Sequence, residues 1–293
     1  MASPVGLATA ALFLAIVPGG YLVLSVDGVR RSSRSLVSRL PSIAQLLAGP
    51  ALVLLAIMGY TATSGLPVAP RLSAYAPYLL VPPLFLAIAP RATGRAPLRE
   101  LAVVFGLWLP IELRILPGLP LPAPDGADMQ KLVGLVEAMY FFLVVRPLPG
   151  IGYTYRLTAR DAATAVIVFL AYAVVALPIG FATGFIGWHP ALDATHLVGG
   201  PLIIYLVTGV PEEFLLRGLL QNLLSGWLGP RLGLVVASIV FGLAHLPDPR
   251  YVLLATIAGV AYGLVYARTQ RITASAITHA LVDATWVALL RAT

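Results

Sequence analysis

The sequence predicts an all-α membrane protein, a polytopic transmembrane helical bundle of about eight to ten spans with its catalytic core in the C-terminal half. Three observations lead to this fold class. The mean hydropathy is +0.92, and 59% of the 293 residues are hydrophobic whereas only 11% are charged. That is more apolar surface than one water-soluble globule buries. The apolar residues also fall into runs of about 20, the length that a helix needs to cross the hydrocarbon core.

Ten such runs follow one another along the chain, separated by short connections. The run 100–117 is the weakest, because Pro110, Glu112 and Pro117 interrupt it, and it is also consistent with a broken or interfacial helix. The connections are too short for a separate soluble domain. We therefore expect one membrane domain, with N-terminal helices over 1–160 and the catalytic core over 161–293. The runs are 5–26, 43–63, 73–90, 100–117, 131–146, 161–184, 197–224, 231–247, 251–267 and 272–291.

The distribution of arginines predicts how the chain is oriented in the membrane. The formal net charge is +7, but most arginines lie in short connections between apolar runs, which indicates topology rather than nucleic acid binding. Arg30, Arg31, Arg34 and Arg39 follow the first run, which lacks the basic start of a cleaved signal peptide. We expect a retained anchor in the cell membrane with the N-terminus outside. The chain has no cysteine, which excludes a thiol nucleophile, a thiolate metal site and disulfides.

Ionisable residues inside the last apolar runs are the candidate functional groups, because charge in hydrocarbon is costly and usually marks function. Glu212 and Glu213 are followed by Arg217. Glu213 and Arg217 are four residues apart on one helix face, so we expect them to pair and Glu212 to point toward another element. Pro211 suits a helix start or a kink in a longer helix. The alternative is a charge network that only fixes helix packing.

Two further motifs carry imidazole groups. Phe241-x-x-x-His245 ends the run 231–247, and His279-x-x-x-Asp283 lies in the last run, where a spacing of four places imidazole and carboxyl on one face. Each motif could instead have a purely structural role. His245 could be a histidine at the membrane interface, and His279 with Asp283 could be a hydrogen-bonded pair that stabilises the helix bundle. The two histidines and the carboxylates are sufficient to activate a water. A carboxylate would act directly as the general base, or two histidines and a carboxylate would hold a metal with an open position.

Taken in order on successive spans, the three motifs resemble those of the CPBP intramembrane metalloprotease family, which includes CAAX prenyl proteases and bacteriocin-processing or Abi-like immunity proteins. The resemblance covers about 100 C-terminal residues. It implies a glutamate- or metal-dependent endopeptidase that cleaves a peptide bond inside the membrane, in a peptide or a prenylated or membrane protein substrate. In the family, the residues that correspond to Glu212 and His245 activate the water, and those that correspond to His279 and Asp283 stabilise the oxyanion or hold a metal.

The resemblance also gives the supporting residues Glu213, Arg217 and Phe241 and a tentative metal set of Glu212, His245 and His279 for a divalent ion such as zinc. One position departs from the family pattern, which most often has Asn where this chain has Asp283. An amide can donate to an oxyanion, whereas an ionised carboxylate only accepts. Asp283 is therefore expected to be protonated, to orient His279 or to bind a cation.

Straight spans would place His245 near the outer end of its helix and His279 in the inner half of its own helix. If the two side chains share a site, the run 231–247 is tilted or re-entrant, or a boundary is misplaced.

Two other classes of protein remain open. One is a proton- or ion-coupled transporter that relays protons through the same carboxylates, although no internal repeat is visible. The other is a non-catalytic immunity or chaperone scaffold.

Gly259 and Gly263 are spaced for close helix packing, and the oligomeric state is not indicated.

Overall fold

The computed structural model describes residues 4–87, 97–120, 129–191 and 195–292. The chain divides into two compact units, unit 1 over Met1–Pro149 and unit 2 over Gly150–Thr293. This division lies earlier in the chain than the boundary at 160/161 that the sequence predicts. The extended segment before the first helix of unit 2 explains the difference, because Tyr266 and Thr273 donate hydrogen bonds to the carbonyl oxygens of Gly150 and Thr154. Both units are helical, as the composition predicts.

Unit 1 is a set of helices packed through apolar and aromatic side chains. The rings of Phe13 and Tyr60 stack with centroids 4.8 Å apart and join the first helix to the fourth. The basic connection after the first span forms a short helix, and Arg34 Nε donates a 2.7 Å hydrogen bond to the carbonyl of Leu143. The elements are α1 (Pro4–Ile16), α2 (Pro18–Val23), α3 (Asp27–Val37), α4 (Ser42–Thr63), α5 (Val68–Leu80), α6 (Leu84–Ala87), α7 (Leu98–Glu112), α8 (Gln130–Met139) and the π-helical segment η1 (Tyr140–Val145).

Unit 2 begins with α9, whose start is fixed by Thr158 and Asp161. Each of these side chains bonds the backbone N–H of the other residue, which satisfies donors that a helix start leaves unpaired. The elements are α9 (Ala159–Ala182), β1 (Ile186–Trp188), η2 (Thr195–Gly199), α10 (Gly200–Ile203), η3 (Ile204–Gly209), α11 (Val210–Glu213), η4 (Phe214–Gln221), α12 (Asn222–Leu228), α13 (Pro230–Leu243), α14 (Pro249–Thr269), α15 (Ile272–Leu289) and β2 (Leu290–Ala292).

Residues 195–228 form one continuous helix, here called the long helix, in which short α-helical and π-helical segments alternate. The sequence allowed Pro211 either at a helix start or inside a longer helix. The structure shows the second arrangement, because Pro211 lies inside the long helix. Proline has no backbone N–H to donate, and π-helical turns occur on both sides of α11. These turns are frequent at functional sites, and here they flank Glu212 and Glu213.

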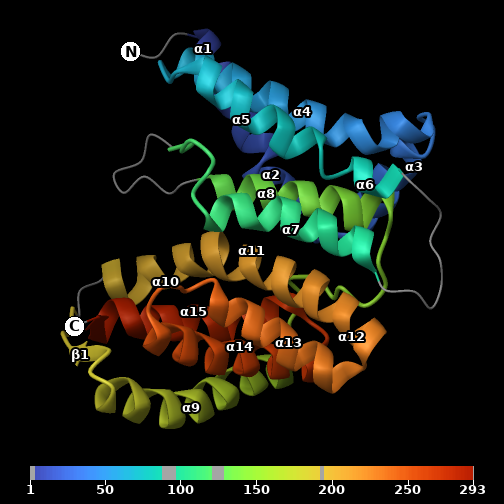
Figure 1. Ribbon diagram of the computed structural model, residues 1–293. Helices are drawn as coiled ribbons and strands as arrows, with labels where there is room; N and C mark the ends of the chain where they lie inside the picture. The colour runs from blue at the N-terminus through green and yellow to red at the C-terminus, as the bar shows by residue number, and fades with distance from the viewer. Residues whose placement is uncertain (1–3, 88–96, 121–128, 192–194, 293) are drawn as a thin grey trace. The chain divides into compact units, whose positions relative to one another are not determined.

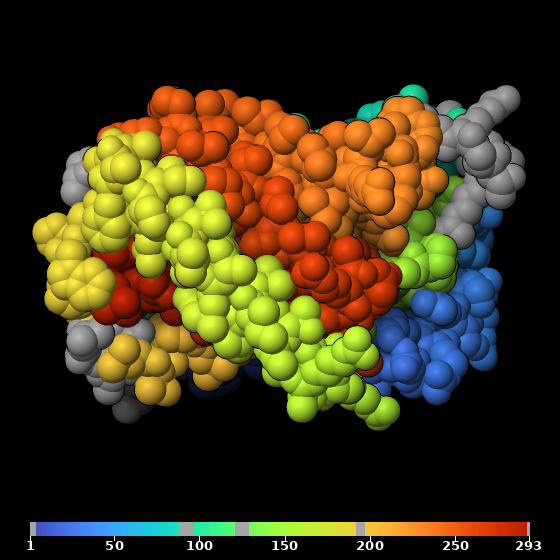
Figure 2. Space-filling view, turned by 90° about the horizontal axis from the view of Figure 1, so that it is seen from below, coloured from blue at the N-terminus to red at the C-terminus, as the bar shows by residue number. Residues whose placement is uncertain are grey.

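The helices of unit 2 form layers that place the three motifs next to one another. The long helix contacts α13, α14 and α15 on one side, and α9 covers α14 and α15 on the other (Figure 1). Figure 2 shows α9, in yellow-green, crossing the face of these two helices. The outer surface of α9 is apolar, with large exposed side chains such as Ile167 and Val174. α14 and α15, which carry the third motif and its neighbours, are therefore the interior helices of the unit.

Close packing of α13 on α14 depends on glycine. A Cβ atom on Gly259 would lie 3.1 Å from both the Cα and the carbonyl oxygen of Ser238, and one on Gly242 would lie 1.9 Å from Thr256 Oγ1. At Gly263 a Cβ would meet the Gln221 side chain of the long helix at 2.7 Å. The packing role that the sequence predicts for Gly259 and Gly263 is confirmed.

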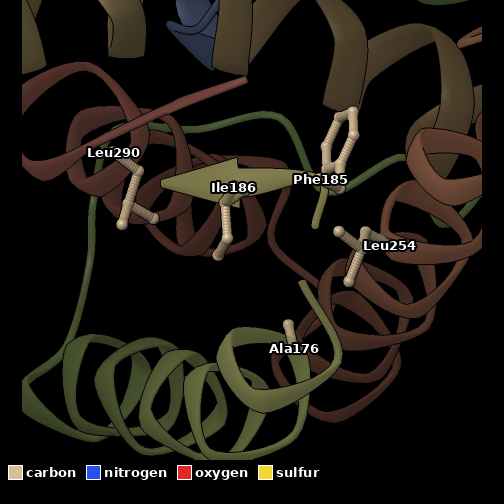
Figure 3. Close-up of a cluster of buried hydrophobic side chains, with 5 residues drawn as sticks. All are labelled: Ala176, Phe185, Ile186, Leu254 and Leu290. Atoms are coloured by element: carbon tan, nitrogen blue, oxygen red, sulfur yellow. The ribbon is translucent and has the colours of Figure 1, made fainter. Parts of the chain in front are cut away.

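A short antiparallel pairing closes one end of unit 2. β1 pairs with β2 in the register Ile186 with Ala292 and Trp188 with Leu290. Beneath it lies a cluster of buried side chains from α9, β1, α14 and the chain's last strand, drawn in Figure 3. The Phe185 ring also packs against Tyr251 of α14, with ring centroids 5.2 Å apart, which ties α14 to the loop after α9. The cluster holds α9 against the interior helices at the end that carries Trp286.

The helix lengths match a multi-pass membrane protein. Among the described residues, the helices that are long and apolar enough to cross a membrane are Pro4–Val23, Ser42–Thr63, Ala159–Ala182, Pro249–Thr269 and Ile272–Leu289. Some of the other predicted runs are shorter or interrupted as helices: the run 73–90 is broken between α5 and α6, and the run 100–117 ends as a helix at Glu112. The run 231–247 is also shorter than predicted, because α13 ends at Leu243. The outside position of the N-terminus stays a prediction.

Gly259→Leu is expected to lower the stability of the protein by at least about 1 kcal/mol, because the new side chain must push the backbone of α13 away from α14. The same substitution at Gly226, where a Cβ would meet nothing within 4 Å, is the control. Thermal unfolding of both variants in detergent measures the difference. Equal melting temperatures would contradict the account of this helix contact.

Candidate active site

Glu213 lies at the centre of the site and joins the long helix to α15. Its carboxylate is fully buried, and each oxygen has a partner. Arg217 Nε donates to Oε2 over 3.1 Å, Ser275 Oγ lies 2.6 Å from the same oxygen, and His279 Nδ1 lies 2.9 Å from Oε1. The predicted pair of Glu213 with Arg217 is therefore present. A buried carboxylate is stable only with such partners. Glu213 therefore fixes the positions of Arg217, Ser275 and His279.

His279 is surrounded by carboxylates on both ring nitrogens. Its side chain is 3% exposed. Nδ1 faces Glu213, and a carboxylate only accepts, so the proton of this hydrogen bond is carried by Nδ1. On the other side of the ring, Nε2 lies 3.5 Å from Asp283 Oδ2 and 3.8 Å from Glu212 Oε2. Imidazole and carboxyl of the third motif thus share a face, and Glu212 points toward α15 rather than along its own helix, as the spacing predicts.

The two adjacent glutamates differ in their surroundings. The Glu213 side chain is 0% exposed, whereas that of Glu212 is 13% exposed. Asp283 is more open still, with 35% of its side chain exposed. Glu212 and Asp283 therefore form the accessible rim of the cluster. Glu213 and Arg217 form its closed base.

His245 lies two residues beyond the end of the helix that was expected to contain it. α13 ends at Leu243, and His245 Nδ1 lies 2.9 Å from the carbonyl oxygen of Phe241. A carbonyl only accepts, so Nδ1 carries a proton, and in the neutral ring Nε2 is then the acceptor. The Phe241 ring lies between the two imidazoles, with centroids 5.0 Å from His245 and 5.8 Å from His279. Phe241, rather than a direct polar contact, connects His245 to the charged cluster.

The loop that carries His245 is fixed at its end by Asp248. Its carboxylate accepts from the backbone N–H and the guanidinium of Arg250 and caps α14. The side-chain hydrogen bond from Arg250 is the main cause that lowers the pKa of Asp248 to about 2. A lowered pKa stabilises the ionised cap at all pH values above the ordinary range of Asp, and this contribution is lost only as the pH falls toward 2. The Arg250 guanidinium also donates to the Gly184 carbonyl.

The fit of a metal ion can be tested on the donor groups. In the part of the chain that the structure describes, no group of three or more His, Cys, Asp or Glu side chains is placed to hold one. Nδ1 of each histidine is engaged, in His279 by Glu213 and in His245 by the Phe241 carbonyl. The predicted set Glu212, His245 and His279 does not form a ligand group among the described residues. The metal assignment therefore stays a prediction, and no step proposed below passes through a metal.

Sequence reasoning missed two residues of the site, Ser275 and Tyr262. Ser275 Oγ lies within hydrogen-bond distance of Glu213 Oε2 and, at 2.9 Å, of the Tyr262 carbonyl oxygen. It is four residues before His279 on α15, so the same helical spacing that linked His279 with Asp283 could have identified it. Tyr262 stacks on His279 from another helix, and no spacing along the sequence signals that contact.

The fold is that of a multi-pass helical membrane protein, and unit 2 buries an interacting cluster of carboxylate, imidazole and guanidinium groups. Residues 194–285 match a family model described as type II CAAX prenyl endopeptidase Rce1-like. All three motifs lie inside the matched segment, so the match confirms their resemblance to this family and supports a protease at the family level. Comparisons with curated proteins and with solved structures gave no match.

Glu213→Ala is expected to destabilise the protein by about 3–5 kcal/mol, because it leaves Arg217 as a buried charge without its carboxylate. The double variant Glu213→Leu with Arg217→Leu should recover part of this loss, since it removes both charges. Asp27→Ala, which removes a carboxylate that is 74% exposed from its pair with Arg30, should cost less than about 1 kcal/mol. Reversible unfolding in detergent measures all three. A Glu213→Ala protein as stable as Asp27→Ala would contradict the central role of Glu213.

Proposed function

We propose that the protein is an intramembrane endopeptidase in which Glu212 activates water for attack on a peptide bond. The observation that carries the proposal is the arrangement around His279. Glu213 holds Nδ1, while Nε2 faces the oxygens of Glu212 and Asp283 at the accessible rim. An acid–base group and a hydrogen-bond donor thereby lie next to each other in a segment similar to CAAX prenyl endopeptidases.

Glu212 suits the role of general base better than Glu213. Both oxygens of Glu213 are occupied by Arg217, Ser275 and His279 in a fully buried site. The Glu212 side chain is 13% exposed, so water can reach it, and its Oε2 lies 3.8 Å from His279 Nε2. In the proposal a water donates one proton to Glu212 and its other hydrogen to the lone pair of His245 Nε2. In the neutral ring that nitrogen is the acceptor, because Nδ1 donates to the Phe241 carbonyl.

The reaction then balances within the site. Glu212 takes the proton as the water oxygen bonds to the carbonyl carbon, and the C=O electron pair moves to the oxygen. His279 Nε2–H donates to this oxyanion; a ring protonated on both nitrogens has its positive charge stabilised by the three carboxylates around it. Collapse of the intermediate breaks the C–N bond, and the leaving amine receives the proton from Glu212. Glu212 is thereby returned to its ionised form.

Asp283 fits this scheme as the group that orients His279. Of the three roles expected for it from the sequence, orientation agrees best with a 3.5 Å separation between Oδ2 and Nε2. Before attack, a carboxylate at this position accepts from Nε2–H and adds negative charge beside the ring; when the intermediate forms, the oxyanion replaces it as the acceptor of that hydrogen. His279 rather than residue 283 then supplies the hydrogen-bond donor to the oxyanion.

The substrate class follows from the site's position among apolar helices and from the matched family. We propose a peptide that reaches the membrane through a lipid group or its own apolar segment, such as a prenylated C-terminal CAAX sequence. A leader peptide and the tail of a membrane protein would also reach the site from the membrane, so they are alternative substrates. A panel that contains all three distinguishes them.

Glu212→Gln is expected to lower kcat for peptide cleavage roughly 10²–10⁴-fold, because the amide keeps the shape of the carboxylate but accepts no proton. The assay uses the full chain purified in detergent or reconstituted in liposomes, with mass spectrometry of the substrate panel. Glu100→Gln, the same substitution in unit 1 at an ion pair with Arg146, is the control and should cleave like wild type.

A Glu212→Gln protein that cleaves at the wild-type rate would exclude this mechanism. If the wild type cleaves no member of the panel, the other two classes become the better interpretation. A proton- or ion-coupled transporter would then show flux in the same liposomes that Glu212→Gln abolishes. A non-catalytic scaffold would show neither activity.

Asp283→Asn is expected to keep kcat within about tenfold of wild type, because the amide oxygen still accepts from His279 Nε2 and the amide group adds a donor. Asp283→Leu should lose roughly 10²-fold, since the ring is no longer oriented. Kinetics of both variants on one cleaved peptide measure the difference. An Asp283→Asn protein as inactive as Asp283→Leu would show that the charge, rather than acceptance of a hydrogen bond, is required.

A further inference from the structure

Tyr262 lies in α14, outside the three motifs, and packs against the face of His279. The two rings are parallel within 12°, with centroids 4.5 Å apart, and Tyr262 is 1% exposed. This is a stacked arrangement of the kind that aromatic side chains favour. This contact is made with the face of the imidazole. The partners of the two ring nitrogens lie at the ring edge and do not support that face.

The hydrogen bonds of His279 leave one rotation of the ring weakly controlled. The outer torsion of a histidine side chain is broad, because it joins an sp³ to an sp² carbon. The bond from Nδ1 to Glu213 fixes one nitrogen, whereas the distances from Nε2 to Asp283 and Glu212 are 3.5 and 3.8 Å. The ring can therefore tilt about Nδ1 unless its face is supported. Tyr262 supports the face, and Phe241 meets the ring at an interplanar angle of 80°.

Tyr262 also contacts Arg217, the second charged partner of Glu213. The guanidinium carbon lies 5.7 Å from the centre of the Tyr262 ring and 5.3 Å from that of Phe241. Nη1 and Nη2 of Arg217 make no hydrogen bond among the described residues, so these two rings are the groups that face the cation there. Loss of either ring would leave the buried guanidinium less well compensated.

The backbone of Tyr262 is tied to the same cluster. Its carbonyl oxygen lies 2.9 Å from Ser275 Oγ, which is also 2.6 Å from Glu213 Oε2. This hydroxyl of α15 lies between two acceptors, the α14 backbone and the central carboxylate, and donates its one hydrogen to either of them. The position of the Tyr262 ring is therefore set by the site itself, and a change in the ring acts on His279 directly.

We propose that Tyr262 is a positioning residue of the active site, and that its ring, rather than its hydroxyl, sets the plane of the His279 imidazole. The proposal rests on the proposed function for its effect on catalysis. It also makes a statement about the orientation of His279 that does not depend on any substrate. Both parts are tested with Tyr262→Phe, which keeps the ring, and Tyr262→Leu, which removes it.

Tyr262→Leu should lower kcat for peptide cleavage roughly 10- to 100-fold with little change in KM, because a misplaced catalytic group slows the chemical step. Tyr262→Phe should restore kcat to within about threefold of wild type, since stacking depends on the aromatic ring. Tyr266→Leu is the matched control, one turn further along α14, where the buried hydroxyl bonds the Gly150 carbonyl. It should lower the melting temperature and leave the kcat of the folded protein unchanged.

The second measurement needs no substrate. The chain has four histidines, so selective ¹⁵N-histidine labelling allows the ring nitrogens of His279 to be followed by NMR, with His279→Gln for assignment. Tyr262→Leu should shift or broaden the His279 signals, and Tyr262→Phe and Tyr266→Leu should not. Wild-type kcat and unchanged signals in Tyr262→Leu would overturn the proposal, as would a loss in Tyr262→Phe as large as in Tyr262→Leu. Altered signals without cleavage by the wild type would support the positioning role and refute the proposed function.

Discussion

The buried carboxylate of Glu213 is the group on which the arrangement of unit 2 depends. A charge inside an apolar helical protein is unfavourable unless it is paired and hydrogen-bonded, and Glu213 meets Arg217 on its own helix and Ser275 and His279 on α15. These bonds fix the rotation of the long helix relative to α15. Once that rotation is set, the neighbouring residue Glu212 faces the far nitrogen of His279. The position of one glutamate therefore determines where the other can act.

Small and aromatic residues make this convergence possible. Gly259 and Gly242 allow α13 and α14 to approach until backbone and side chain touch, which places Phe241 beside Tyr262 at a centroid distance of 5.7 Å. The two rings then fill the space between the histidines and face the Arg217 guanidinium. The closed base of the site is thus charged at its centre and aromatic around it, and the accessible groups lie at the rim.

The sequence predicted those features that depend on spacing along one helix. The apolar runs, the pairing of Glu213 with Arg217, the shared face of His279 and Asp283 and the packing glycine Gly259 all follow from a period of 3.6 residues or from span length. The predicted run 231–247 extends four residues past the observed end of α13 at Leu243. Pro247 disfavours a helical residue before it, and this signal could have moved the boundary toward the observed end at Leu243. His245 lies in the turn after α13, so the length of a straight span does not give its depth. Contacts between helices, such as Tyr262 on His279, could not be predicted, because they depend on how whole helices rotate and pack.

A double-mutant cycle between Glu213 and His279 tests most directly whether this carboxylate ties the long helix to α15. The stabilities of Glu213→Gln, His279→Gln and the double variant are compared with that of the wild type in one detergent. The account predicts that the two changes are coupled by about 1 kcal/mol or more, in the range typical of residues within one hydrogen-bond network. Strictly additive effects would contradict it, because the two side chains would then contribute to folding independently.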